Sequence, residues 1–320
     1  MTLIDRYIGY ISSMRRYSPR TCAVYADVLG RFVSRCCVSG GDSDIIAGLT
    51  PDSVRNYMVW LMDELGESPR TVNLHLSVLG GFCRYLCSEN LLKINPVRAV
   101  ARPKTPKRLP SVYKEEEMRR YFSDTECRAS AESADLVTGG DPASVEIWTA
   151  RRNRLVIRLL FDTGMRRAEL ISLDISSVDF RRGVVRVHGK GNKTREIPML
   201  SGLSEEISLY LVVTEKVLGG VRDDSEPLLV TAKGSRLYPM AVERIVREEL
   251  GEAGITGRKS PHSLRHTLAT ELLDGGSDLN SIKELLGHSS LAATQVYTHT
   301  SVEKLKQSYN NAHPRAKRRS

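Results

Sequence analysis

The side chains best suited to chemistry lie in one stretch, residues 260–297. Ser260-Pro261 predicts a helix start, because Ser caps helix N-termini and Pro fits the first helical position. His262 and Arg265 are three residues apart, so both should project from one face of the first turn. The N-terminal end of a helix favours a bound anion, and a His and an Arg at that end therefore predict a phosphate site.

A second helix should position further polar groups. Residues 279–286 predict a short helix that stops at Gly287, which puts His288 at a helix end. One more turn then carries Tyr297. Each of these residue types is common in structural roles, with His and Tyr in cores and Arg in surface ion pairs. Their ordered spacing is what indicates chemistry.

This ordered pattern resembles the catalytic signature of the tyrosine recombinases, also called phage-type integrases. That signature has an Arg in a TGxR segment, a Lys in a β-hairpin turn, an HxxR helix, a later GH pair and then a Tyr. The matching segments here are Thr163-Gly164-Met165-Arg166 followed by Glu169, Gly189-Lys190-Gly191-Asn192-Lys193, His262-Ser263-Leu264-Arg265, Gly287-His288 and Tyr297. One such segment is a weak signal, whereas all of them in this order indicate the family.

The resemblance implies that Tyr297 attacks a DNA phosphate and forms a 3′-phosphotyrosyl link. Arg166 and Arg265 would clamp the non-bridging oxygens, because guanidinium groups match phosphate oxygens and oppose the negative charge of a pentavalent state. His288 would donate a third hydrogen bond.

Two proton transfers would accompany this attack. A free phenol has a pKa of about 10, so a base must help, and His262 is the expected base. Lys190, on a turn, would protonate the 5′-oxygen that leaves, and Glu169 would orient Arg166 or the loop around it. No clustered carboxylates and no GxxxxGK[ST] loop accompany the signature, so we expect no metal and no cofactor.

The composition is compatible with a DNA-binding protein. Lys and Arg total 47 against 38 Asp and Glu, and this net charge of +9 favours a polyanionic partner, most often nucleic acid, the alternative being a basic protein without such a partner. The resemblance implies that the partner is double-stranded DNA. No apolar run is long enough to span a membrane and no signal peptide is evident, so a cytoplasmic location is expected. The cysteines lack zinc-site spacing and are expected to be reduced thiols: Cys22, Cys36, Cys37, Cys83, Cys87 and Cys127.

An internal echo organises the first part of the chain. Ser18-Pro19-Arg20-Thr21 recurs as Ser68-Pro69-Arg70-Thr71, and apolar residues at helical spacing follow each copy. Thr50-Pro51 starts another helix. Residues 1–95 are therefore predicted to form an all-helical bundle, which by resemblance is a SAM-like core-binding domain. Arg20 and Arg70 are either DNA contacts or solvated surface arginines.

Residues 96–111 change character, with prolines spaced among basic residues. This composition predicts an extended basic linker and not a packed element. The linker is either a solvated hinge or a strap across DNA phosphates. The basic residues that would make such a strap include Arg102, Lys104, Lys107 and Arg108.

Residues 112–320 are predicted to form the catalytic domain, mainly α-helical with a small antiparallel β-sheet. A buried helix over residues 155–161 should stop at Gly164. Residues 123–143 are polar and predict a long surface loop or insertion. The remaining elements expected are helices over 113–122, 203–217 and 240–250 and strands over 178–180, 184–188 and 194–198.

His313-Pro314-Arg315-Ala316 is similar to the close of Xer-type recombinases, which favours Xer-like resolution of chromosome dimers. In that family four protomers, identical or of two kinds, assemble on two DNA sites. The tail over residues 304–320 would then either pack on a neighbouring subunit or be a plain basic tail. The alternatives are an integrase, transposase or invertase of a mobile element, a type IB topoisomerase, and a DNA-binding protein that has lost catalysis. Base contacts, and so the DNA site, are not readable from the sequence.

Overall fold

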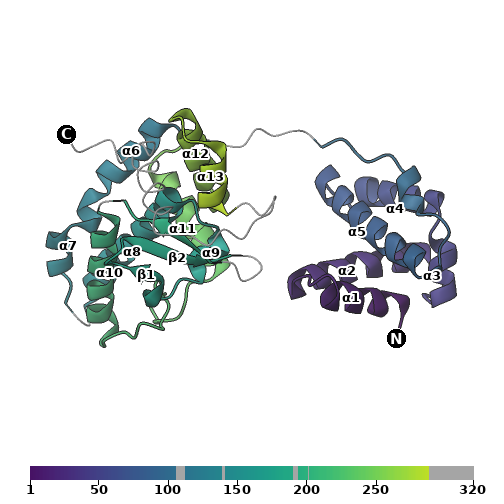
Figure 1. Cartoon of the computed structure of the whole chain (residues 1–320), viewed down its shortest axis with the longest axis horizontal. Helices are drawn as coiled ribbons and strands as arrows, with labels where there is room; N and C mark the ends of the chain where they lie inside the picture. The colour runs from purple at the N-terminus through teal and green to yellow at the C-terminus, as the bar shows by residue number, and fades with distance from the viewer. Residues whose placement is uncertain (106–111, 139–140, 190–193, 201, 288–320) are drawn as a thin grey trace. The chain divides into compact units, whose positions relative to one another are not determined.

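The computed structural model describes residues 1–105, 112–138, 141–189, 194–200 and 202–287. The chain divides into two compact units, Met1–Arg108 and Leu109–Ser320 (Figure 1). Each unit has its own hydrophobic core. The fold class predicted from the sequence, mainly α-helical with a small antiparallel sheet, is confirmed.

The described part of the first unit is entirely helical. Its elements are α1 (Leu3–Ser13), α2 (Pro19–Cys36), α3 (Asp42–Gly48), α4 (Pro51–Val59), the π-helical turn η1 (Trp60–Glu64), α5 (Pro69–Ser88) and the 3₁₀ turn η2 (Pro96–Ala99). The two copies of the sequence repeat form equivalent helix starts. Ser18 and Ser68 each accept a hydrogen bond from the main-chain N–H three residues later. α2 and α5 pack against each other, as do α1 and α2.

The start of the expected linker is part of this first unit. Pro96 and Val97 lie in η2 and are buried, and Val100 is 6% exposed. Asn95 fastens the turn, because its side-chain amide donates to the main-chain oxygen of Gly80 in α5 at 3.0 Å. The prediction of an unpacked linker is therefore wrong for its first residues, because two valines give that segment enough apolar surface to bury.

The second unit is built around α8 (Pro142–Thr163), which packs against α10, α11 and α12 (Figure 1). Residues 154–163 of α8 are all buried, as expected of a helix that is covered on every side. The other helices are α6 (Glu115–Asp124), η3 (Glu126–Ala129), α7 (Ala131–Asp135), α9 (Arg167–Ile171), η4 (Ile175–Ser177), α10 (Leu203–Leu218), α11 (Pro239–Glu252), α12 (Pro261–Asp274) and α13 (Leu279–Leu286).

A three-stranded antiparallel sheet completes this unit, as predicted. The strands are β1 (Val178–Asp179), β2 (Val184–His188) and β3 (Thr194–Pro198), in the order β1-β2-β3. Val184 pairs with Pro198 and His188 with Thr194, and Lys190 follows β2 in the sequence, outside the described residues.

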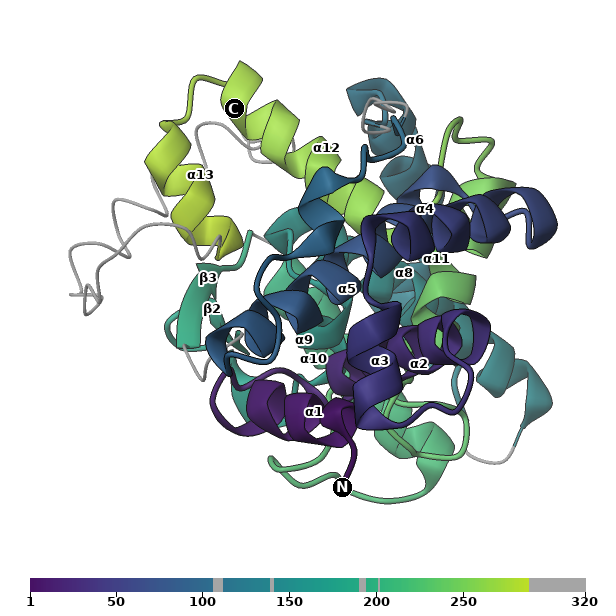
Figure 2. The same cartoon turned by 90° about the vertical axis from the view of Figure 1, so that its right-hand side faces the viewer.

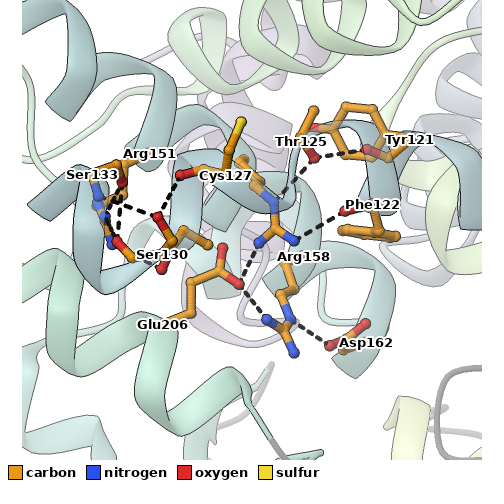
Figure 3. Close-up of polar contacts among 12 residues, drawn as sticks. Tyr121, Phe122, Thr125, Cys127, Ser130, Ser133, Arg151, Arg158, Asp162 and Glu206 are labelled. Carbon is orange, nitrogen blue, oxygen red and sulfur yellow. Dashed lines mark hydrogen bonds and ion pairs between the residues drawn. The ribbon is translucent and has the colours of Figure 1, made fainter. Parts of the chain in front are cut away.

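Residues 123–143 are not the irregular loop that the sequence predicts, because η3 and α7 lie within them. Arg151 of α8, which is 0% exposed, holds these short helices in place. It donates to the main-chain oxygens of Ala129 at 3.2 Å and Ser130 at 2.6 Å, and to Oγ of Ser133 at 2.6 Å (Figure 3). The polar composition of the segment thus supplies acceptors for a buried guanidinium.

Two more arginines of α8 share one buried carboxylate, Glu206 of α10 (Figure 3). Nη1 of Arg154 lies 2.5 Å from Oε2 of Glu206, and Arg158 also bonds to that oxygen. Arg158 in addition donates through Nε to Asp162 at 3.2 Å. The four side chains of this network, two arginines and two carboxylates, are each at most 9% exposed. Their charges are therefore neutralised by one another, because little solvent reaches them.

Glu206→Ala is therefore expected to destabilise the protein by about 3 kcal/mol, since it removes one partner from a buried ionic group and leaves charge uncompensated. The free energy of unfolding, measured by urea titration and circular dichroism, checks this. Arg119→Ala is the control, because it breaks an exposed pair with Glu115 that solvent already screens and should change stability little. Equal losses in the two variants would contradict the buried-network interpretation.

Candidate active site

The first turn of α12 is built as the sequence predicts. Ser260 caps it by accepting from the N–H of Ser263 at 3.2 Å, and Pro261 occupies the first helical position. His262 is exposed, whereas Arg265 is 7% exposed. The same turn thus offers one accessible imidazole and one largely buried guanidinium.

Arg265 is oriented by main-chain oxygens of two other helices. Its Nη1 donates to Gly164 at the end of α8, and its Nη2 donates to Leu286 at the end of α13, both at 2.6 Å. Helix C-termini carry unsatisfied carbonyls and partial negative charge, so they are suitable partners for a guanidinium.

Arg166 lies at the start of α9 and is tied to Glu169 twice. Its main-chain N–H donates to Oε2 of Glu169 at 2.7 Å and its Nη1 donates to Oε1 at 2.8 Å. Its Nη2 reaches the main-chain oxygen of Gly287 at 2.9 Å. The Arg166 side chain is still 37% exposed, which leaves a fixed guanidinium facing solvent.

Gly164 allows α8, α12 and α13 to approach so closely. Its φ is +59°, in the left-handed region that favours glycine. A Cβ at this position would lie 2.6 Å from Cδ2 of Leu286 and 2.9 Å from Cδ2 of Leu268. The Thr-Gly-x-Arg turn therefore brings Arg166 and Arg265, 99 positions apart in the sequence, to the same helix end.

Sequence reasoning missed a third arginine, Arg195 of β3. It is 8% exposed and donates through Nη1 and Nη2 to the two oxygens of Glu169, at 3.0 and 2.8 Å. Its Nε donates to the main-chain oxygen of Leu285 at 3.0 Å. The signal was present in the strand pattern, because Arg195 and Ile197 occupy inward positions of β3 and a charged residue at such a position needs a buried partner.

The electrostatics of the cluster favour an anion. Burial would raise the pKa of Glu169, but hydrogen bonds from Arg195 and Arg166 outweigh it and lower that pKa to about 2. Burial, together with the charges of Arg166 and Arg195, lowers the pKa of Arg265 to about 10. Three guanidinium groups against one carboxylate leave an excess of two positive charges, which is suitable for a phosphate.

The pKa of His262 is lowered from its ordinary value, first by desolvation and then by the charges of neighbouring cations that include Arg265 and Arg167. Glu243 acts in the opposite direction but is itself paired with Arg167 at 2.6 Å. The lowered pKa favours the neutral imidazole, which is the form that can accept a proton.

The other predicted site residues are placed only in part. Lys190, His288 and Tyr297 lie outside the described residues, as do Lys107 and Arg108. Arg20, Arg70 and Lys104 are exposed in the first unit. Arg102 is held against α5, where its Nη1 donates to Oγ of Ser77 at 2.9 Å.

Within the described ranges, no group of three or more His, Cys, Asp or Glu side chains is arranged to hold a metal ion. Likewise, none of the helices described has the length and apolarity needed to cross a membrane.

Two family models match this chain. The phage integrase N-terminal SAM-like domain matches residues 4–90, and the phage integrase family matches residues 145–304. The chain belongs to the phage integrase family. It is therefore a tyrosine recombinase, an enzyme that cleaves and rejoins DNA at specific sites.

Individual members of the phage integrase family agree with this assignment. Tyrosine recombinase XerC of Bacillus pumilus is 36% identical over 323 residues, which cover 99% of this chain and 98% of that protein. The XerH site-specific recombinase bound to a palindromic difH substrate, in a post-cleavage complex, has a TM-score of 0.62 at 23% identity and covers 89% of this chain and 77% of its own. A lambda integrase tetramer bound to a Holliday junction has a TM-score of 0.61 at 18% identity, with 92% and 79% covered. The two structures share the fold.

The pKa of His262 is expected to lie below 6.5 in the free protein, because partial burial and nearby cations oppose its protonation. An NMR titration of the imidazole resonances measures this value, and the spectrum of His262→Gln identifies the His262 signal. Glu243→Gln should lower the midpoint further, since the Glu243 charge favours the imidazolium. A midpoint at or above 6.5 would contradict the expectation.

Proposed function

We propose that Tyr297 is the nucleophile of this recombinase and that it attacks a DNA phosphate to give a 3′-phosphotyrosyl intermediate. The observation that supports this is the meeting of Arg166 and Arg265 at the end of α13, directly before His288 in the chain. Phosphoryl transfer needs fixed positive charge around the non-bridging oxygens, and these two guanidinium groups supply it.

In the proposed step, the phenolic oxygen of Tyr297 forms a bond to phosphorus while the bond from phosphorus to the 5′-oxygen breaks. His262 accepts the phenolic proton, for which its lowered pKa makes it available at neutral pH. Lys190 donates a proton to the departing 5′-oxygen, and His288 donates a hydrogen bond to a non-bridging oxygen. Rejoining is the reverse, with a 5′-hydroxyl attacking the phosphotyrosine.

Glu169 has a supporting role in this proposal. Its buried carboxylate bonds both the main chain and the side chain of Arg166, so it fixes the direction in which that guanidinium points. Because the arginines and Lys190 supply the charge that the transition state requires, the reaction is expected to need neither a divalent metal nor a cofactor.

DNA is the proposed partner of both units. The net charge of +9 favours binding to a polyanion, with strong dependence on salt. Phosphate contacts in the first unit are assigned to the two equivalent helix starts and to the basic segment that follows α5. The residues proposed for them are Arg20, Arg70, Arg102, Lys104, Lys107 and Arg108.

The proposed cellular role is Xer-like resolution of chromosome dimers in the cytoplasm. It is supported by the relative named XerC, which spans nearly the whole chain, and by the Xer-like motif at residues 313–316. The active species is proposed to be a tetramer of identical or paired recombinases on two sites, in line with the lambda integrase tetramer.

Tyr297→Phe is expected to abolish covalent protein–DNA adducts, because phenylalanine lacks the attacking oxygen. The protein is incubated with chromosomal DNA of its source, sparsely nicked so that cleaved strand ends diffuse away, and quenched in detergent. Adducts are then purified and their DNA is sequenced, which also gives the target site. Tyr238→Phe is the matched control, since Tyr238 is an exposed tyrosine outside the signature.

The wild type and the control should form adducts in EDTA as well as in magnesium. Adducts that persist in Tyr297→Phe would remove this residue as the nucleophile. Adducts that form only with magnesium would contradict the proposed metal-free chemistry.

A further inference from the structure

Arg195 is the residue that joins three elements of the second unit. All three of its side-chain nitrogens donate to protein acceptors: Nη1 and Nη2 to Glu169, and Nε to the main-chain oxygen of Leu285. It lies in β3, whereas its partners lie in α9 and α13. Figure 2 shows α13 next to β3, the two elements that the bond from Arg195 to Leu285 joins.

The main chain of Gly287 lies directly against the guanidinium. A Cβ built on Gly287 would be 3.0 Å from Nη1 and 3.2 Å from Cζ of Arg195, and φ of Gly287 is +65°. The left-handed glycine that ends α13 therefore fits against Arg195 as closely as a residue without a side chain permits.

The last turn of α13 is fastened by three arginines in succession. The main-chain oxygen of Leu285 accepts from Arg195, that of Leu286 from Arg265 and that of Gly287 from Arg166. These are the carbonyls that a helix C-terminus leaves without intrahelical partners. The residue after Gly287 in the sequence is His288, which the proposed function places in the reaction.

Resting on the proposed function, we infer that Arg195 is a positioning residue that holds Arg166 and the end of α13 in a fixed relative position. Its Nη1 and Nη2 donate to Glu169, the residue that orients Arg166. Its Nε donates to the main-chain oxygen of Leu285 at the end of α13. Since its nitrogens are engaged with protein groups, Arg195 acts through these neighbours and not by contact with the phosphate.

The positioning role of Arg195 requires the planar geometry of a guanidinium. Guanidinium presents parallel donors that match both oxygens of a carboxylate and a further donor on Nε, whereas an ammonium is a point charge. Arg195→Lys keeps the charge of the cluster but cannot serve Glu169 and Leu285 together. The variant should leave the DNA-binding surface intact while allowing the end of α13 to move relative to Arg166.

The test measures the single-turnover rate of covalent adduct formation on a nicked duplex carrying the site recovered from trapped adducts. Arg195→Lys is expected to lose about 10- to 100-fold in this rate, as for other residues that orient a functional group. Its Kd for the duplex should stay within about twofold, because the phosphate-binding side chains are retained. Arg195→Met, which removes the charge too, should lose at least as much.

Arg151→Lys is the matched control for a structural effect. Arg151 is also buried in this unit and bonded to two main-chain oxygens and a hydroxyl, but its partners lie in the segment around η3 and α7 (Figure 3). Arg151→Lys should lower Tm about as much as Arg195→Lys does, and it should leave the cleavage rate of the folded protein unchanged.

A double variant distinguishes positioning from general damage. If Arg195 acts through the end of α13, which directly precedes His288 in the sequence, then Arg195→Lys combined with His288→Ala should cleave at least about tenfold faster than the product of the two single losses predicts. Three results would each overturn the inference while the proposed function stands. They are a double-variant rate equal to the product of the two single losses, a wild-type rate in Arg195→Lys, and a loss of rate in Arg151→Lys equal to that in Arg195→Lys. No adduct from the wild-type protein would overturn the proposed function, and this inference with it.

Discussion

The structure of the second unit depends on how a buried carboxylate, Glu169, is satisfied. A carboxylate at 5% exposure is unfavourable unless hydrogen bonds replace its water. Glu169 accepts from the main chain and side chain of Arg166 and from both terminal nitrogens of Arg195. These hydrogen bonds to Glu169 cap the start of α9 and orient the exposed guanidinium of Arg166. They also attach strand β3 to α9.

The carbonyl groups at the end of α13 impose a second constraint on the same arginines. Its free carbonyls attract Arg195, Arg265 and Arg166, and this brings together β3, α12 and the turn after α8. Gly164 makes that approach sterically possible, because any side chain there would collide with Leu286. The arginines are thus held by the ends of helices, whose geometry is set by the core around α8.

Local signals in the sequence predicted the elements whose determinants are local. Ser18, Ser68 and Ser260 cap helices as expected, and the antiparallel strands after β1 follow from alternation and a Gly-rich turn. Arg166, Glu169 and Arg265 were predicted from ordered motifs, and the structure brings them together. Arg195 was missed because its partner Glu169 lies 26 residues earlier, on another element. The same reason explains the ordered helices in residues 123–143, which depend on the distant guanidinium of Arg151.

The arrangement has an electrostatic cost that its proposed substrate relieves. Three arginines surround a single glutamate, and their mutual repulsion together with burial lowers the pKa of Arg265 to about 10. Such a cluster is less stable alone than one with matched charges, because the excess positive charge is held in a poorly solvated place. A phosphate supplies the missing negative charge, and the pentavalent state supplies more of it than the ground state does. In the proposed reaction, the charge that destabilises the free protein is therefore the charge that favours the transition state.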